Sequence, residues 1–177
     1  MCGIYGLMAL RAGANCDSRL LDAMAKSTRH RGPDDQGQIV DMGVAIGMRR
    51  LSIIALSTGH QPIPNSSETI WTVCNGEIYN FRQVRQDLQQ QGVKFRTGSD
   101  VEVIVHLYER YGLDFVSGLT GMFGFAIWDA NRRRLVLGRD RLGIKPLYYM
   151  KHEGRLIFAS EIKALLTIPE VHRELDQ

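Results

Sequence analysis

A cysteine at position 2 is the first residue of this chain that could do chemistry. If Met1 is removed, Cys2 carries a thiol and the chain's α-amino group on one residue. Their reference pKa values are about 8.5 and about 7.7–8.0, so the amine could take the thiol proton near neutral pH. With Met1 in place the nitrogen is an amide and is no base. The pair predicts a nucleophile, and the alternative is a small buried core cysteine.

Asn75 and Gly76 form a second candidate, because attack of a thiolate on an acyl group creates an oxyanion. Asn75 offers a side-chain amide, and Gly76 offers a backbone N–H that a substrate can approach closely because there is no Cβ. The alternative is an Asn-Gly hairpin turn, a common use of this dipeptide. Taken by itself, the turn is the better interpretation.

Three charged residues could bind a free amino acid. The guanidinium of Arg50 can hold an α-carboxylate, and Asp100, at the start of a predicted helix, can hold an ammonium group with Glu77 as a second acceptor. The alternatives are a solvated strand end for Arg50 and a helix-start charge for Asp100. In isolation each alternative is favoured.

The elements that must position these residues follow from the spacing of apolar residues. Helices are predicted over 18–29, 81–91 and 160–167, and another begins near Asp100, with Ser99 and Glu102 as a capping box. Arg29 to Asp35 reads as a charged loop. Strands are predicted over 3–10, 43–54, 69–74 (stopped by Asn75-Gly76), 121–128, 135–137, 147–150 and 156–159. Continuous apolar strands are covered on both faces, so we expect an α+β fold: a four-layer αββα sandwich of two mainly antiparallel sheets flanked by helices.

Composition narrows the class of protein. The 177 residues favour one domain, and the net charge of +3 is spread out, which gives no reason to expect a nucleic-acid partner. No apolar run reaches the roughly 18 residues of a membrane helix. Three cysteines, an odd number without a CxxC pair, suit free thiols in a reducing, cytoplasmic compartment. The five histidines lack metal-ligand spacing, so no metal is assigned.

Eight segments together resemble the class II glutamine amidotransferase domain, and most closely the glutaminase domain of glutamine-hydrolysing asparagine synthetases. They run in order from residue 2 to about residue 166. The segments are MCGIYG, RHRGPDDQG, RRLSII, NGEIYN, TGSDVEVI, GMFGFAIWD, GRDRLGIKPLYY and FASEIKAL. One such match would be weak, whereas eight in register are specific.

The resemblance implies an N-terminal nucleophile hydrolase fold and hydrolysis of the side-chain amide of L-glutamine. Cys2 would form a glutamyl thioester after removal of Met1, with its α-amine as the base. Asn75 and Gly76 would form the oxyanion hole. The implied substrate-binding residues are Arg50 for the carboxylate, Glu77 and Asp100 for the ammonium group, and Leu51, Ile53 and Ile54 for the shape of the pocket.

The resemblance also implies a domain over 2–168 and, over 169–177, the start of a linker to an ammonia-accepting synthetase domain. ATP and Mg²⁺ are expected only there, because this chain has no phosphate-binding loop and needs no cofactor of its own. The oligomeric state stays open, a homodimer included. The competing functions are a non-catalytic glutamine-binding regulatory module and an N-terminal nucleophile hydrolase for another amide.

Overall fold

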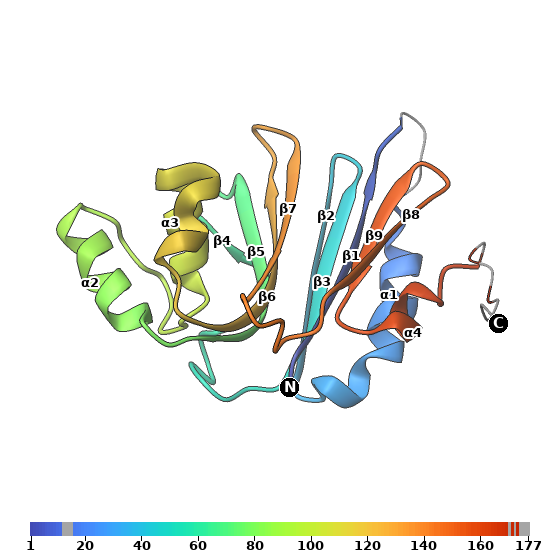
Figure 1. The fold of residues 1–177 in the computed structure, drawn as a ribbon, viewed down its shortest axis with the longest axis horizontal. Helices are drawn as coiled ribbons and strands as arrows, with labels where there is room; N and C mark the ends of the chain where they lie inside the picture. The colour runs from blue at the N-terminus through green and yellow to red at the C-terminus, as the bar shows by residue number, and fades with distance from the viewer. Residues whose placement is uncertain (12–15, 170, 172, 174–177) are drawn as a thin grey trace.

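Apolar residues on both faces of the central strands decide the architecture. In β1 (Gly3–Ala9), Ile4 packs in the cluster between the two sheets, whereas Tyr5 and Leu7 pack in the cluster under the helices. In β6 (Gly121–Asp129), Trp128 faces the other sheet and Phe125 faces the helices, and both are buried. A strand that is apolar on both faces must be covered twice. The expected αββα sandwich is therefore confirmed (Figure 1).

The computed structural model describes residues 1–11, 16–169, 171 and 173. All strand pairs within this part are antiparallel. One sheet has the order β2-β3-β1-β9-β8 and the other β4-β5-β6-β7. The remaining strands are β2 (Asp35–Asp41), β3 (Val44–Arg50), β4 (Ile63–Pro64), β5 (Ile70–Ile78), β7 (Arg134–Arg139), β8 (Tyr148–His152) and β9 (Arg155–Ala159).

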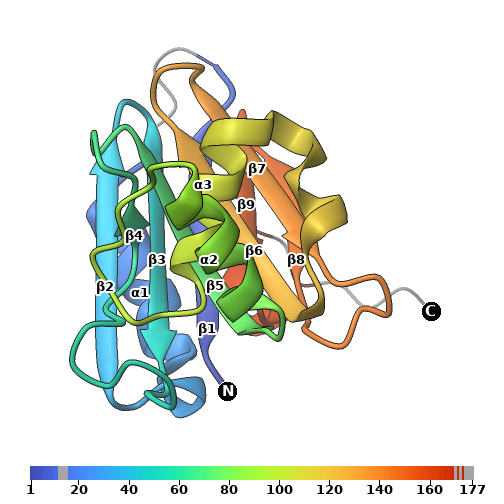
Figure 2. The same ribbon diagram turned by 90° about the vertical axis from the view of Figure 1, so that its left-hand side faces the viewer.

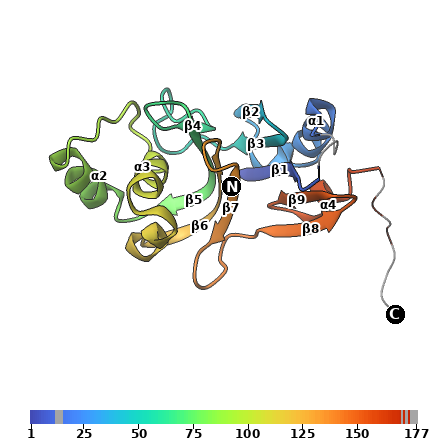
Figure 3. The same cartoon turned by 90° about the horizontal axis from the view of Figure 1, so that it is seen from above.

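Two pairs of helices form the outer layers. Helices α1 (Ser18–Ser27) and α4 (Ile162–Leu165) cover the five-stranded sheet, and α2 (Phe81–Gln90) and α3 (Glu102–Tyr111) cover the four-stranded sheet, in front of which they stand in Figure 2. Two 3-10 helices follow α1 and α3, at Arg29–Arg31 and Gly112–Gly118. The view from above shows the layers in a row, with the N-terminus between the sheets (Figure 3).

The predicted stop of a strand at Asn75-Gly76 is wrong. Strand β5 continues through both residues to Ile78, and Gly76 pairs with Phe123 of β6. Gly76 has a φ of +155°, and a Cβ there would lie 2.1 Å from the carbonyl oxygen of Met122. The glycine is required by this close approach of two strands. The hairpin-turn interpretation of Asn75-Gly76 falls with the predicted stop.

Two other expectations also differ from the structure. Strand β2 begins at Asp35, where a loop was predicted to end, and was not foreseen, because an edge strand with polar residues lacks the apolar alternation that marks a buried strand. The Ser99–Glu102 capping box does not form. Ser99 Oγ accepts from the N–H of Val101 instead, and the Glu102 carboxylate binds backbone N–H groups further back in the chain.

The predicted helices are present with shifted ends, and α4 is shorter than residues 160–167. The expected linker over 169–177 lies mostly outside the described residues, which include Pro169, Val171 and Arg173 of it. Among the described residues, no helix is long and apolar enough to cross a membrane, and no group of three His, Cys, Asp or Glu side chains is arranged to hold a metal ion.

Candidate active site

Cys2 lies where β1 enters the sandwich. Gly3 pairs with Arg49 of β3, so the preceding residue, Cys2, lies beside the chain that leaves β3. Its Sγ is 3.4 Å from the backbone N–H of Leu51 and 3.6 Å from the Leu51 carbonyl oxygen. The thiol is half-buried. The backbone of Leu51 thus holds the sulfur in place.

Arg31 binds the backbone of Cys2. Its Nε donates to the Cys2 carbonyl oxygen at 2.8 Å, and its Nη1 donates to Glu161 at 2.9 Å. Glu161 also contacts His30 and Lys163. Burial by itself would raise the pKa of Glu161, but its bonds with Arg31, His30 and Lys163 outweigh burial and lower the pKa to about 2. An ionised Glu161 thus holds the guanidinium that orients Cys2.

Asn75 and Gly76 face the thiol from the opposite sheet. Asn75 is 1% exposed, and its Nδ2 is buried without a hydrogen-bond partner in the described part of the chain. An unpaired buried amide N–H₂ is costly and is rare in folded proteins. The unpaired Nδ2 lies in the same cavity as Cys2, so it is available to donate a hydrogen bond to an acceptor atom of a bound ligand.

Arg50 stands at the end of β3 and is 6% exposed. Its Nη2 donates to the carbonyl oxygens of Ile54 and Ala55, at 2.6 and 2.9 Å, and its Nη1 makes only a long contact with Leu56, at 3.5 Å. A Cβ at Gly59 would lie 2.3 Å from Nη2, so this glycine leaves room for the guanidinium. Arg50 therefore orders the loop after β3 and keeps donor capacity on Nη1.

Asp100 supplies the negative charge on the other side. Its Oδ2 accepts from the backbone N–H of Ile78 at 2.9 Å, and the residue is 4% exposed. Burial is the main cause that raises the pKa of Asp100, and the nearby Glu77 acts in the same direction against backbone hydrogen bonds that lower the pKa. A cation in front of the carboxylate would offset both effects.

All nine residues predicted for the site line one cavity of about 220 Å³. The cavity brings together the thiol, the unpaired amide, the guanidinium and two carboxylates, from both sheets and from the loops after β3 and before α3. The nine are Cys2, Arg50, Leu51, Ile53, Ile54, Asn75, Gly76, Glu77 and Asp100.

Seven further residues line the cavity and were not predicted: Met1, Gln61, Cys74, Ser99, Val101, Met122 and Lys145. Gln61 is buried and its Oε1 accepts from the Cys74 N–H at 2.7 Å. Lys145 is also buried, with its Nζ 3.8 Å from the sulfur of Met1. A lysine or glutamine in a loop segment normally signals solvent exposure, so nothing in the sequence pattern marks these two residues.

A second cavity is larger, about 480 Å³, but holds none of the predicted site residues. It lies beside the 3-10 helix Gly112–Gly118 and includes Arg139, Asp140 and Arg141. Asp140 is buried and accepts from the backbone N–H groups of Ile144 and Lys145, so it organises this turn. Volume alone does not identify an active site; the smaller cavity has the reactive groups.

Comparison with solved structures identifies the fold. The glutamine phosphoribosylpyrophosphate amidotransferase from B. subtilis superposes with a TM-score of 0.79 at 22% sequence identity, over 94% of this chain and 43% of that one. An allosteric regulatory enzyme of purine biosynthesis superposes with the same TM-score at 24% identity. The chain thus has the same fold as these two proteins.

Sequence comparison gives the family. The model of the glutamine amidotransferase domain matches residues 1–177. Asparagine synthetase [glutamine-hydrolyzing] 2 of Bacillus subtilis is 44% identical over 99% of this chain and 24% of its own length. Asparagine synthetase B of Escherichia coli is 38% identical over 98% of this chain and 31% of its own, and the amidase chyE of Penicillium rubens is 41% identical over 94% and 26%. The chain belongs to the glutamine amidotransferase domain family and spans about a quarter of the length of these relatives.

Proposed function

We propose that this domain hydrolyses the side-chain amide of L-glutamine through a thioester on Cys2. The observation that carries the proposal is the unpaired Nδ2 of buried Asn75 in the same cavity as the Cys2 thiol. A thiol and an unsatisfied donor on opposite walls are what the attack on an amide requires, because the attack converts the carbonyl oxygen into an oxyanion.

Removal of Met1 would free the α-amine of Cys2 and, because Met1 lines the cavity, would also enlarge it. The amine then takes the thiol proton, and the sulfur attacks the amide carbon. The oxyanion of the tetrahedral intermediate accepts from Asn75 Nδ2 and from the N–H of Gly76. When the C–N bond breaks, the α-ammonium returns its proton to the leaving group, and ammonia departs. Water then attacks the thioester, the C–S bond breaks, and glutamate and the thiol are restored.

Charged residues on two sides of the cavity would hold the α-carbon end of glutamine, where its carboxylate and ammonium group lie. Arg50 binds the α-carboxylate with the donors that the loop leaves available, and Asp100 with Glu77 binds the α-ammonium. Leu51, Ile53 and Ile54 shape the rest of the pocket, chiefly through their backbone. This charge pattern selects a free α-amino acid over a peptide, which carries no adjacent pair of opposite charges at the scissile side chain.

The ammonia would pass to an ATP-dependent synthetase domain of the asparagine synthetase type, as the names of the asparagine synthetase relatives suggest. ATP and Mg²⁺ belong to that domain in this proposal. Three free thiols, of which Cys16 and Cys74 are buried, persist in a reducing compartment, which supports a cytoplasmic location.

An intact-mass measurement tests the proposal. The purified chain is treated with methionine aminopeptidase, loss of Met1 is verified, and a diazoketone analogue of glutamine is added. We expect a single label that excess glutamine blocks. A Cys16→Ser control should keep the label and Cys2→Ser should lose it. A processed chain that takes up no label would overturn the thioester mechanism and favour a glutamine-binding regulatory module.

A further inference from the structure

The segment 96–101 carries Asp100 into the cavity without being a helix or a strand. It connects the loop after α2 to the start of α3. Ser99, Asp100 and Val101 line the cavity, and a bond from the N–H of Ile78 fixes Asp100 to β5. Six irregular residues have many conformations, and ordering each costs about 1–2 kcal/mol of backbone entropy. Other contacts must therefore hold this segment.

The carboxylate of Glu102 binds the beginning of the segment. Its Oε1 accepts from the N–H of Arg96 at 2.7 Å, and its Oε2 accepts from the N–H of Thr97 at 2.8 Å and from Thr97 Oγ1 at 2.6 Å. Thr97 Oγ1 in turn accepts from the N–H of Ser99 at 3.0 Å. Glu102 is 1% exposed and does not line the cavity. Its three acceptor bonds are all made to residues that precede Asp100.

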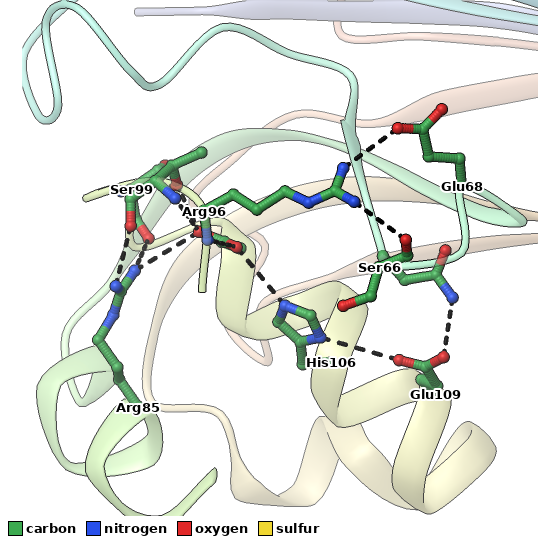
Figure 4. Close-up of polar contacts among 10 residues, drawn as sticks. Ser66, Glu68, Arg85, Arg96, Ser99, His106 and Glu109 are labelled. Carbon is green, nitrogen blue, oxygen red and sulfur yellow. Dashed lines mark hydrogen bonds and ion pairs between the residues drawn. The ribbon is translucent and has the colours of Figure 1, made fainter. Parts of the chain in front are cut away.

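Arg85 of α2 binds the carbonyl side of the same segment. Its Nη1 donates to the Thr97 carbonyl oxygen at 2.9 Å and its Nη2 donates to that of Ser99 at 3.1 Å; Figure 4 shows the guanidinium pointing at this segment. Nη2 also lies 3.7 Å from Glu102, and the guanidinium stacks 4.2 Å above the ring of Phe95. We call Glu102, Arg85 and Thr97 the segment clamp.

His106 and Glu109 lie behind the clamp, on the next turns of α3. His106 is buried, with its Nε2 3.5 Å from Glu102 and its Nδ1 3.8 Å from Glu109 (Figure 4). Glu109 accepts from Asn65 next to β4. Glu109 therefore shares His106 with Glu102 but has no hydrogen bond to residues 96–101 among those described, which makes it a matched control.

Two carboxylates two residues apart thus have opposite environments. Asp100 faces the cavity and burial raises its pKa. Burial acts against ionisation of Glu102 as well, but the adjacent His106 and the hydrogen bonds from Thr97 and Arg96 outweigh burial and lower its pKa to about 2. Glu102 is consequently ionised at neutral pH and takes its hydrogen bonds from the segment itself, whereas Asp100 lines the cavity.

We propose that Glu102 is a positioning residue for recognition of the substrate's α-ammonium group, acting through the segment clamp on Asp100. This inference rests on the proposed function, in which Asp100 binds that group. When the clamp is lost, the segment gains conformations in which Asp100 does not face the cavity, and the ammonium loses its partner. The thiol on the other sheet keeps its own anchors.

The test compares hydrolysis of glutamine with hydrolysis of 5-amino-5-oxopentanoate, which is glutamine without the α-amino group. The wild-type ratio of kcat/KM values should favour glutamine by roughly 10–100-fold, the range expected for a charge-assisted hydrogen bond of about 1.5–3 kcal/mol. Glu102→Gln should bring the ratio to within about threefold of unity, and the milder Thr97→Val should lower it at least threefold. Glu109→Gln should leave it unchanged.

Each outcome separates the two levels of the proposal. If the wild-type enzyme shows no preference for glutamine, the ammonium role of Asp100 fails. If the wild-type preference is present and survives in both Glu102→Gln and Thr97→Val, the positioning role of Glu102 is overturned. The rate of Cys2 alkylation by iodoacetamide, which has no ammonium group, should stay at the wild-type value in every variant. The Thr97→Val result decides if Glu102→Gln fails to fold.

Discussion

The two sheets contribute to the cavity through the same electrostatic arrangement but with different protection from solvent. On the five-stranded sheet, Glu161 holds Arg31, which binds the backbone of Cys2. On the four-stranded sheet, Glu102 holds the segment that carries Asp100. The pKa of each buttressing carboxyl group is lowered to about 2. The side chain of Glu102 is 1% exposed and that of Glu161 is 21% exposed.

This difference teaches that a lowered pKa does not by itself measure a contribution to stability. The partners of Glu161 include His30 and Lys163, whose side chains are more than half exposed. Water and salt screen such pairs, which contribute little, usually below about 1 kcal/mol. The Glu102 carboxylate is itself buried and accepts from two backbone N–H groups, so screening is weaker there and an unpaired carboxylate is costly.

The largest expected effect is the loss of turnover on substitution of Asn75, which faces the thiol from the opposite sheet. Asn75→Ala should lower kcat by roughly 10²–10³-fold, because the variant lacks a donor to the oxyanion. Steady-state ammonia release with glutamine measures the change, and Asn65→Ala, a buried asparagine outside the cavity, controls for loss of an internal amide. A loss below tenfold would remove Asn75 from the oxyanion hole.

The next largest effect is expected on the stability of the protein at acid pH, where Glu102 becomes protonated. The folded-state pKa of Glu102, about 2, lies below its ordinary value of 4.5. The unfolded chain binds more protons between these values, so the stabilisation is complete above about pH 4.5 and disappears as the pH falls toward 2. The shift corresponds to on the order of 3 kcal/mol. Urea unfolding should show Glu102→Gln less stable than wild type by about this amount at pH 7 and by about 1 kcal/mol at pH 3. A difference that does not depend on pH would contradict the assignment.

Substitution of Arg50 tests the proposed binding of the substrate's α-carboxylate. Arg50→Ala should raise KM for glutamine roughly 10–100-fold, as expected for loss of a charge-assisted hydrogen bond, and should lower kcat less. Because Arg50 also holds the carbonyl oxygens of Ile54 and Ala55, Arg50→Lys serves as the partner variant that keeps the charge. An effect on kcat with KM unchanged would be incompatible with a grip on the substrate.

The smallest effect is expected at Glu161. Glu161→Gln should destabilise the protein by about 1 kcal/mol at low ionic strength and by less at 0.5 M salt, where the Debye length falls to a few ångströms. The loss in Glu102→Gln should be the same at both salt concentrations. Urea unfolding curves of both variants at the two salt concentrations measure this difference. Equal salt dependence of the two variants would contradict the difference in solvent protection between Glu102 and Glu161.

The residues of the candidate site could be predicted from the sequence, whereas most of the contacts that position them could not. The nine predicted residues all line one cavity. They could be predicted because each belongs to a segment whose residues and whose order in the chain resemble one family. The layered fold also followed from the sequence, since strands such as β6 are apolar on both faces and must be covered twice. The expected stop at Gly76 and the Ser99–Glu102 box failed because local propensity cannot register a neighbouring strand or a loop that bends back.

By itself, the sequence determined the reactive groups and their family, because residue type and spacing carry that information. Only the tertiary structure decided that the amide of Asn75 stays unpaired, that Arg31 binds the backbone of Cys2, and that Glu102 binds the segment whose Asp100 lines the cavity. The physical reason is that burial and hydrogen-bond partners arise between residues far apart in the chain: 29 positions separate Arg31 from Cys2, and 130 separate it from Glu161. Such contacts, and the pKa shifts that they cause, exist only once folding has brought these distant segments together.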